Sequence, residues 1–109
     1  MEKPAKKGRR FEHEVAERTG GEVVALSGGG PEKEDVIEEG WLVQCKFTDK
    51  DSFSFSNKLW DTVSKNAVMR GRKPRVELSI HGKTYVILDT RTFDKLRMEA
   101  SSGDPDSSL

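Results

Sequence analysis

The sequence predicts a single α/β (α+β) domain with a mixed central sheet flanked by helices. The main observation is the order of its segments, in which helical and strand-like patterns follow one another as α-β-β-β-α-β-β. The length of 109 residues is typical of one domain. Charged residues make up 35% of the chain and hydrophobic residues 33%, so the core has to be small.

The first half of the chain is expected to form one helix and three strands. Phe11 and Val15 follow the spacing of a helix over 8–19, which Gly20-Gly21 ends. A flexible basic arm is expected before it, over 1–7. After the helix, the sequence predicts a strand over 22–27, a glycine-rich loop over 28–31 and a strand–turn–strand hairpin over 35–46.

The second half is expected to begin with a linking loop over 47–56. Ser56 is a suitable N-cap for a helix over 57–70. Two strands, a short helix and a disordered tail are then predicted over 74–80, 84–88, 91–98 and 99–109. Residues 8–98 would therefore form the one folded domain.

Three polar side chains of the hairpin are the primary candidates for a functional site. Asp35 lies on its first arm, and Gln44 and Lys46 lie on the second. Gln44 and Lys46 are two residues apart and therefore face the same side of their strand. Paired strands lie about 5 Å apart, so all three side chains can converge. A carboxylate, an amide oxygen and an ammonium group make a poor core but a sensible metal-dependent phosphodiester site.

Cysteine usage and hydropathy exclude several classes of protein. Cys45 is the only cysteine, which rules out an intramolecular disulfide and indicates a reducing compartment. Its thiol alternates away from Gln44 and is expected to be buried as a small hydrophobe. No apolar run approaches the roughly 20 residues of a membrane span, and the amino terminus lacks the apolar segment of a signal peptide. A cytoplasmic protein is expected.

The distribution of charge is more informative than the net charge of zero. An acidic segment over 32–39 lies between two basic segments over 1–10 and 58–75. This arrangement suits a site that collects cations while its rims bind phosphates. Ordinary mixed surface charge explains the same pattern equally well.

These motifs, in this order, resemble those of the PD-(D/E)XK nuclease superfamily, whose shared restriction-endonuclease-like core is αβββαβ. The similarity covers roughly residues 8–88. Gly8-x-x-x-Glu12 is similar to the opening of archaeal and phage Holliday-junction resolvases, and Ser27-Gly28-Gly29 resembles their Ser/Gly-rich loop. Gln44-Cys45-Lys46 looks like the signature of Mrr-type restriction domains. Gln44 stands where most members of the superfamily have their second acid.

The resemblance implies a DNA endonuclease that hydrolyses phosphodiester bonds with Mg²⁺, for which Mn²⁺ can substitute. Glu12, Asp35, Gln44 and the backbone carbonyl of Cys45 would hold the metal. Lys46 would orient or deprotonate the attacking water, or stabilise negative charge on the phosphate. The competing interpretation of each of these side chains is a polar residue that simply faces water.

Phosphate contacts are expected from basic residues around the site and from the glycine-rich loop, because such contacts position DNA without reading its sequence. The candidates are Arg9, Arg10, Ser27, Gly28, Gly29, Lys58, Arg70, Arg72 and Lys73. The leading hypothesis is a homodimer that cleaves branched DNA. The alternatives are a restriction-like, nicking or repair nuclease of the same fold acting on duplex DNA, and a catalytically decayed module that binds DNA or a protein.

Overall fold

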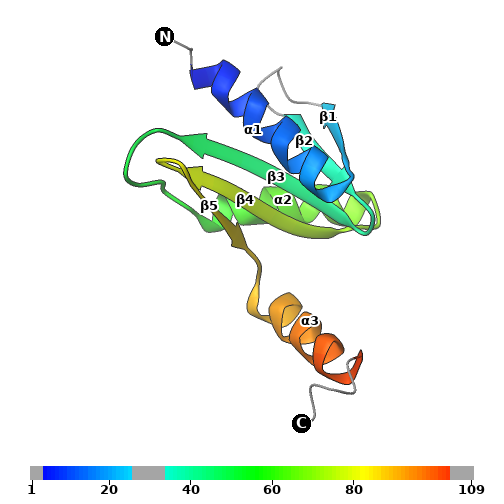
Figure 1. The fold of residues 1–109 in the computed structure, drawn as a ribbon. Coiled ribbons are helices and arrows are strands. Elements are labelled where there is room, and N and C mark those ends of the chain that lie inside the picture. The colour runs from blue at the N-terminus through cyan, green and yellow to red at the C-terminus, as the bar shows by residue number, and fades with distance from the viewer. Residues whose placement is uncertain (1–3, 26–33, 104–109) are drawn as a thin grey trace.

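The computed structural model describes residues 4–25 and 34–103. In this part of the chain, a five-stranded mixed sheet and three helices form an α+β fold (Figure 1). The helices are α1 (Pro4–Thr19), α2 (Asn57–Met69) and α3 (Thr90–Gly103). The strands are β1 (Glu22–Ala25), β2 (Glu34–Glu38), β3 (Trp41–Thr48), β4 (Lys73–Ile80) and β5 (Lys83–Ile87). The predicted order of helices and strands is confirmed.

The sheet has the strand order β1-β2-β3-β4-β5. Its pairs are antiparallel except for β3 and β4, which run parallel. Parallel strands need a crossover connection, and α2 supplies it. The sheet is therefore mixed, as expected from the sequence, with β3 at its centre.

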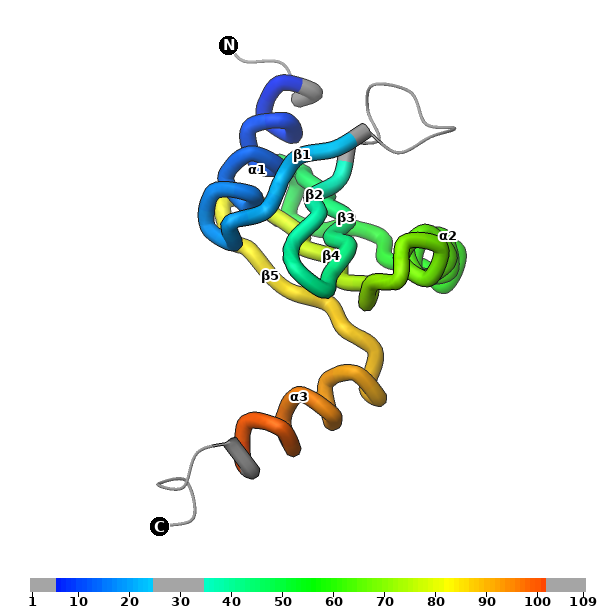
Figure 2. Tube along the Cα trace, turned by 90° about the vertical axis from the view of Figure 1, so that its right-hand side faces the viewer, coloured from blue at the N-terminus to red at the C-terminus, as the bar shows by residue number. Residues whose placement is uncertain are grey.

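The two faces of the sheet are covered by different helices, with α1 on one side and α2 on the other (Figure 2). α1 packs over β1, β2 and β3, whereas α2 packs over β3 and β4. The core under α1 comprises Phe11, Val15, Ala16, Val36, Val43 and Cys45. α2 buries Val63 and Ala67 on its inner side. β3 thus lies beneath both helices, and its residues 42–45 are all buried.

The start of α2 confirms a predicted cap. The backbone N–H of Leu59 donates to Ser56 Oγ at 3.2 Å, and Ser56 has the extended backbone of an N-cap. The helix ends at Met69, one residue before the predicted end, because Arg70 is its C-cap.

The expected ends of the folded region need correction. α1 begins at Pro4, so residues 4–7 are helical and not a flexible arm. Proline is tolerated in the first turn of a helix, and the alanine and lysines that follow are good helix formers. Lys7 also pairs with Asp49 at 3.0 Å. α3 continues to Gly103, so residues 99–103 are helical where a disordered tail was expected; Glu99 and Ala100 favour the helical state.

β3 is longer than the sequence suggested. It continues through Phe47 and Thr48, which were expected to begin the linking loop. The parallel neighbour explains the difference, since Phe47 pairs with Ser79 and Thr48 with Ile80. A partner strand thus extends β3 beyond its locally strand-like sequence. The predicted glycine-rich loop over 28–31 lies outside the described residues.

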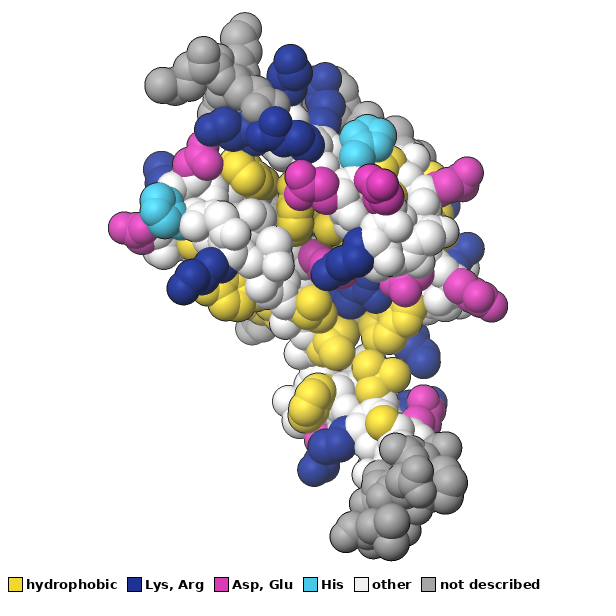
Figure 3. Space-filling model, viewed as in Figure 1, with side chains coloured by type: hydrophobic (Ala, Val, Ile, Leu, Met, Phe, Trp, Pro, Cys, Tyr) yellow, Lys and Arg dark blue, Asp and Glu magenta, His cyan; other side chains and the backbone are white. Residues whose placement is uncertain are grey.

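α3 extends away from the body of the fold (Figure 1) and makes almost no contact with the other helices and strands. It lengthens the molecule to 51 Å, against 30 and 27 Å in the other directions. Hydrophobic side chains gather where the body narrows towards α3 (Figure 3). The exposed large hydrophobic residues of the described chain include Phe55, Val86 and Phe93. Within residues 4–25 and 34–103, no helix has the length and apolar content needed to cross a membrane.

The turn from α1 into β1 depends on a close backbone approach at Gly21. A Cβ atom there would lie 2.6 Å from the carbonyl oxygen of Ile37 and 2.9 Å from Val36 Cγ1. The Gly21 N–H also donates to the carbonyl of Ala16 at 2.9 Å, which closes the end of the helix. A side chain at this position would push β1 away from β2.

We expect Gly21→Ala to lower the free energy of unfolding by about 1–3 kcal/mol, because the new methyl group meets backbone atoms that cannot move aside. Urea denaturation followed by circular dichroism measures this. Gly8→Ala is the matched control: Gly8 lies inside α1, and a Cβ added to it would meet no atom within 4 Å, so alanine should stabilise by about 0.5–1 kcal/mol. Equal midpoints for the two variants would contradict the steric argument.

Candidate functional site

The packing under α1 determines which way each side chain of β3 points. Val43 and Cys45 belong to the core beneath α1. Because successive side chains of a strand alternate between faces, Gln44 and Lys46 point to the opposite face, which α2 covers. The same reasoning applies to β2, where Val36 packs under α1 and Asp35 therefore faces the α2 side.

The three polar residues of the hairpin are consequently on one face. Val36 pairs with Val43 at the end of the paired region of β2 and β3, and Asp35 and Gln44 are the next residues on the two strands. Lys46 is then the diagonal neighbour of Asp35, within reach for a long side chain. Its positive charge acts on the Asp35 carboxylate. The structure thus brings together Asp35, Gln44 and Lys46, as the sequence predicted.

Asp35 is deeply buried and poorly satisfied. Only 1% of its surface is exposed, and its Oδ1 atom has no hydrogen-bond partner among the described residues. Burial raises the pKa of Asp35 from 3.8 to about 7, although the positive charges of Lys46 and Arg70 act to lower it. An unsatisfied buried carboxyl oxygen is costly in free energy, so its retention calls for an explanation such as a bound ion or water.

The donor atoms on this face fit Mg²⁺ better than a transition metal. A carboxylate and the amide oxygen of Gln44 are hard ligands, and Mg²⁺ is commonly held by one or two carboxylates while it keeps several waters. Gln44 is itself buried. Among the described residues, no group of three or more His, Cys, Asp or Glu side chains could hold a metal ion. A metal here would therefore depend on Asp35, with Gln44 and water completing its coordination.

Glu12 does not join these three residues on the α2 face. It is buried on α1 beside Phe11, and Phe11 packs under that helix against Cys45. The negative charges of Glu12 and of Asp35 both raise the pKa of the Cys45 thiol, so Cys45 feels both carboxylates. Glu12 thus comes from α1, whereas Asp35 comes from the strand face that points towards α2.

Cys45 is a buried structural residue, as expected. Burial raises the pKa of its thiol far above the usual value, and the negative charges of Glu12, Glu77 and Asp35 raise it further. A thiol in such surroundings stays protonated and unreactive. The two histidines, His13 and His81, are exposed, which agrees with their predicted surface positions.

The predicted phosphate-binding residues fall at several places around the fold. Arg70 is exposed at the end of α2 and its charge acts on Asp35. Arg72 donates to the carbonyl of Glu38 at 2.8 Å, and Lys73 holds its ammonium 5.5 Å from the centre of the Trp41 ring. Lys58 is exposed at the start of α2, and Arg9 and Arg10 are exposed on α1. The other three candidates, Ser27, Gly28 and Gly29, lie outside the described residues.

The sequence analysis did not predict a cluster of ion pairs on the face of the sheet that α1 covers. Glu77 is 2% exposed and accepts hydrogen bonds from Arg18 and from Arg75, the latter at 3.0 Å. Arg75 also pairs with Glu38 at 2.7 Å. The sequence contains a signal for this cluster. Val76 and Leu78 face one side of β4, so Arg75 and Glu77 both face the opposite side. Removing one partner of such a buried pair costs about 3–5 kcal/mol.

Comparison of this chain with protein-family models, with curated proteins and with solved structures finds no match. The fold and the side chains on the α2 face are therefore the basis for assigning a function.

The raised pKa of Asp35 predicts a specific dependence of stability on pH. The folded state holds this proton up to pH of about 7 and the unfolded state releases it near 3.8. The unfolded chain therefore binds fewer protons across this window, and the free energy of unfolding falls as the pH rises.

We expect Asp35→Asn to become more stable than the wild type as the pH rises from about 4 to about 7, by on the order of a few kcal/mol, with a constant difference above that. Urea midpoints at a series of pH values measure this. Asp51→Asn, at an exposed position, is the control and should follow the wild type. A constant difference between Asp35→Asn and wild type from pH 4 to 8 would show that the carboxyl group is not buried as described.

Proposed function

We propose that this chain is a Mg²⁺-dependent DNA endonuclease with a PD-(D/E)XK-type core. The observation that carries the proposal is the buried carboxylate of Asp35, whose Oδ1 has no hydrogen-bond partner among the described residues and which shares a sheet face with Gln44 and Lys46. The order α-β-β-β-α-β of the described elements supports the same superfamily. The proposed substrate is branched DNA cut by a homodimer, because one small domain cleaves one strand and a junction presents two.

The roles of the side chains follow from their chemistry. Asp35 and Gln44 would hold the Mg²⁺, which supplies a Lewis acid and a bound water for phosphodiester hydrolysis. Lys46 presents a compact positive charge on a flexible stem beside Asp35. It would orient or deprotonate the attacking water, or stabilise negative charge on the phosphate. Glu12 lies in the other layer, so it would contribute only through its charge.

A second candidate function is a nuclease-like module that binds DNA or a protein without cleaving it. Two observations favour this alternative: Glu12 packs on the α1 side, and no cluster of three or more potential metal ligands occurs within the described residues. The presence of Gln44 where a second acid is usual agrees with a decayed site. A restriction-like, nicking or repair nuclease differs from the leading proposal only in substrate, since the same side chains would serve it.

The proposal predicts Mg²⁺-dependent cleavage of a labelled four-way junction, with weaker cleavage of linear duplex, nicked and flap DNA. We expect Lys46→Ala and Asp35→Asn to reduce the cleavage rate by at least about a hundredfold, because each removes a group that acts at the reacting phosphate. Gel assays at one fixed salt concentration measure the rates. Lys50→Ala and Asp51→Asn are matched controls at exposed positions and should cleave normally. If Mg²⁺ and Mn²⁺ both leave all four substrates intact, the chain is not a nuclease.

Metal binding separates the enzyme from the decayed module. We expect the wild type to bind Mn²⁺ in calorimetric titrations, Asp35→Asn to lose this binding, and Gln44→Glu to strengthen it by about tenfold or more through an added carboxylate. The titration belongs at pH 8, where Asp35 is ionised. Asn57→Asp adds the same charge at an exposed position and should leave the affinity unchanged. Absence of Mn²⁺ binding to both wild type and Gln44→Glu would favour the non-catalytic alternative.

A further inference from the structure

A second candidate binding site lies between α3 and the start of β4, outside the Asp35 face. Its cavity of about 190 Å³ is lined by Lys73, Arg91, Thr92, Lys95 and Leu96. Three of these five side chains are cationic, and none is acidic. The sequence assigned no role to Arg91 or Lys95, because neither is near the candidate hairpin in the chain.

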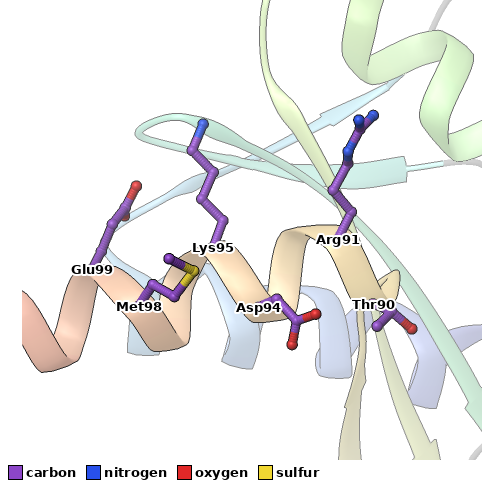
Figure 4. A pocket seen from close by; sticks show the side chains of 6 residues that line it. All are labelled: Thr90, Arg91, Asp94, Lys95, Met98 and Glu99. Carbon is purple, nitrogen blue, oxygen red and sulfur yellow. The ribbon is translucent and has the colours of Figure 1, made fainter.

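The two cations of α3 are directed to the same side. Arg91 and Lys95 are four residues apart, and residues at this spacing are neighbours on a helix surface. Figure 4 shows both side chains extending from one side of α3, with Asp94 directed away from them. Asp94 instead pairs with Arg97 at 3.2 Å. Glu99, one turn further along α3, extends to the same side as Lys95 (Figure 4) but does not line the cleft, whereas Arg91 and Lys95 do.

The charges that line this cleft are not used by the ion pairs of the fold. Those pairs engage Lys7, Arg18, Arg75 and Arg97, and none described in the structure joins Lys73, Arg91 or Lys95 to a carboxylate. The nearby Asp89 caps α3 by accepting the N–H of Thr92 at 2.9 Å. A hydrogen bond from the Thr92 side chain lowers the pKa of Asp89 most, the bond from the Thr92 N–H lowers it further, and the charge of Arg91 has a smaller effect. Three like charges around one cavity repel, and a bound anion relieves that repulsion.

The cleft continues a basic strip that begins at the end of α2. Arg70 and Arg72 precede Lys73 in the tight connection from α2 to β4, and Arg70 is exposed. Arg70 is near enough to Asp35 for its charge to act on that carboxyl group, and Lys73 lines the cleft together with Arg91 and Lys95. A row of cations of this kind matches a polymer with regularly spaced single negative charges better than it matches an isolated small anion.

We propose that the cleft between α3 and β4 binds a phosphate of the DNA backbone, so that α3 grips the substrate away from the reacting bond. This inference rests on the proposed DNA-binding function. The ligand group is a phosphodiester, held by Lys73, Arg91 and Lys95 through charge. Contacts of this type fix the position of a nucleic acid without reading its sequence.

The test is the affinity of the full-length protein for a fluorescent four-way junction, measured by anisotropy in EDTA so that no cleavage occurs. We expect Arg91→Glu/Lys95→Glu to bind at least about tenfold more weakly at 0.1 M salt. The slope of log K against log salt should also become shallower by about 0.9 for each phosphate that the variant no longer neutralises. Arg91→Gln/Lys95→Gln should give a smaller loss in the same direction. Circular dichroism checks that the variants remain folded.

Arg97→Glu is the control, since it makes one substitution of the same kind, with half the total change of charge, at an exposed position of α3 outside the cleft. It should lose clearly less affinity per charge than either cleft variant. If the cleft variants bind like the control, with an unchanged salt slope, the inference is wrong while the nuclease proposal stands. A wild-type protein that binds no DNA would overturn both, and one that binds but does not cleave would overturn the nuclease alone. If the cleft variants bind DNA normally but bind an acidic protein more weakly than the wild type does, the assignment of the cleft to DNA is wrong.

Discussion

The alternation of side chains along β3 is the constraint on which the rest of the structure depends. This strand lies beneath α1 on one face and α2 on the other, and four consecutive residues, 42–45, are buried. Val43 and Cys45 belong to the core beneath α1, whereas Leu42 is buried on the face that α2 covers. A shift of the strand pairing by one residue would turn Val43 and Cys45 towards α2 and bury Lys46 beneath α1. The register of the sheet therefore determines which side chains make up the candidate site.

Glu77 and Asp35 are buried carboxylates with different surroundings. Glu77, on the α1 side, is 2% exposed and is paired with two arginines. Asp35, on the α2 side, is 1% exposed, and its Oδ1 has no hydrogen-bond partner among the described residues. Buried charges usually need partners, and Glu77 follows that rule. The ion pairs of Glu77 therefore offset the cost of its burial, whereas the burial of Asp35 without a hydrogen bond to Oδ1 from the described residues lowers the stability of the fold.

Much of the fold followed from local patterns in the sequence. Helical spacing around Phe11 and Val15, glycine pairs at helix ends and the Ser56 cap were sufficient to predict the order of elements. The convergence of Asp35, Gln44 and Lys46 was also predictable, because strand alternation and antiparallel pairing are local rules. The features that the sequence did not predict depend on contacts with residues far away in the chain. The extension of β3 depends on β4, which follows only after the whole of α2, and the layer of Glu12 depends on where α1 docks.

The loose attachment of α3 bears on how this protein can change over evolutionary time. The sheet and the two helices that cover it are complete by the end of β5, and α3 shares almost no packing with them. Substitutions on α3 therefore do not have to be matched by compensating changes in the core. Selection can alter the helix, lengthen it or replace it while the hairpin that carries Asp35 and Lys46 stays the same. The packing of the core thus places few constraints on the residues of α3.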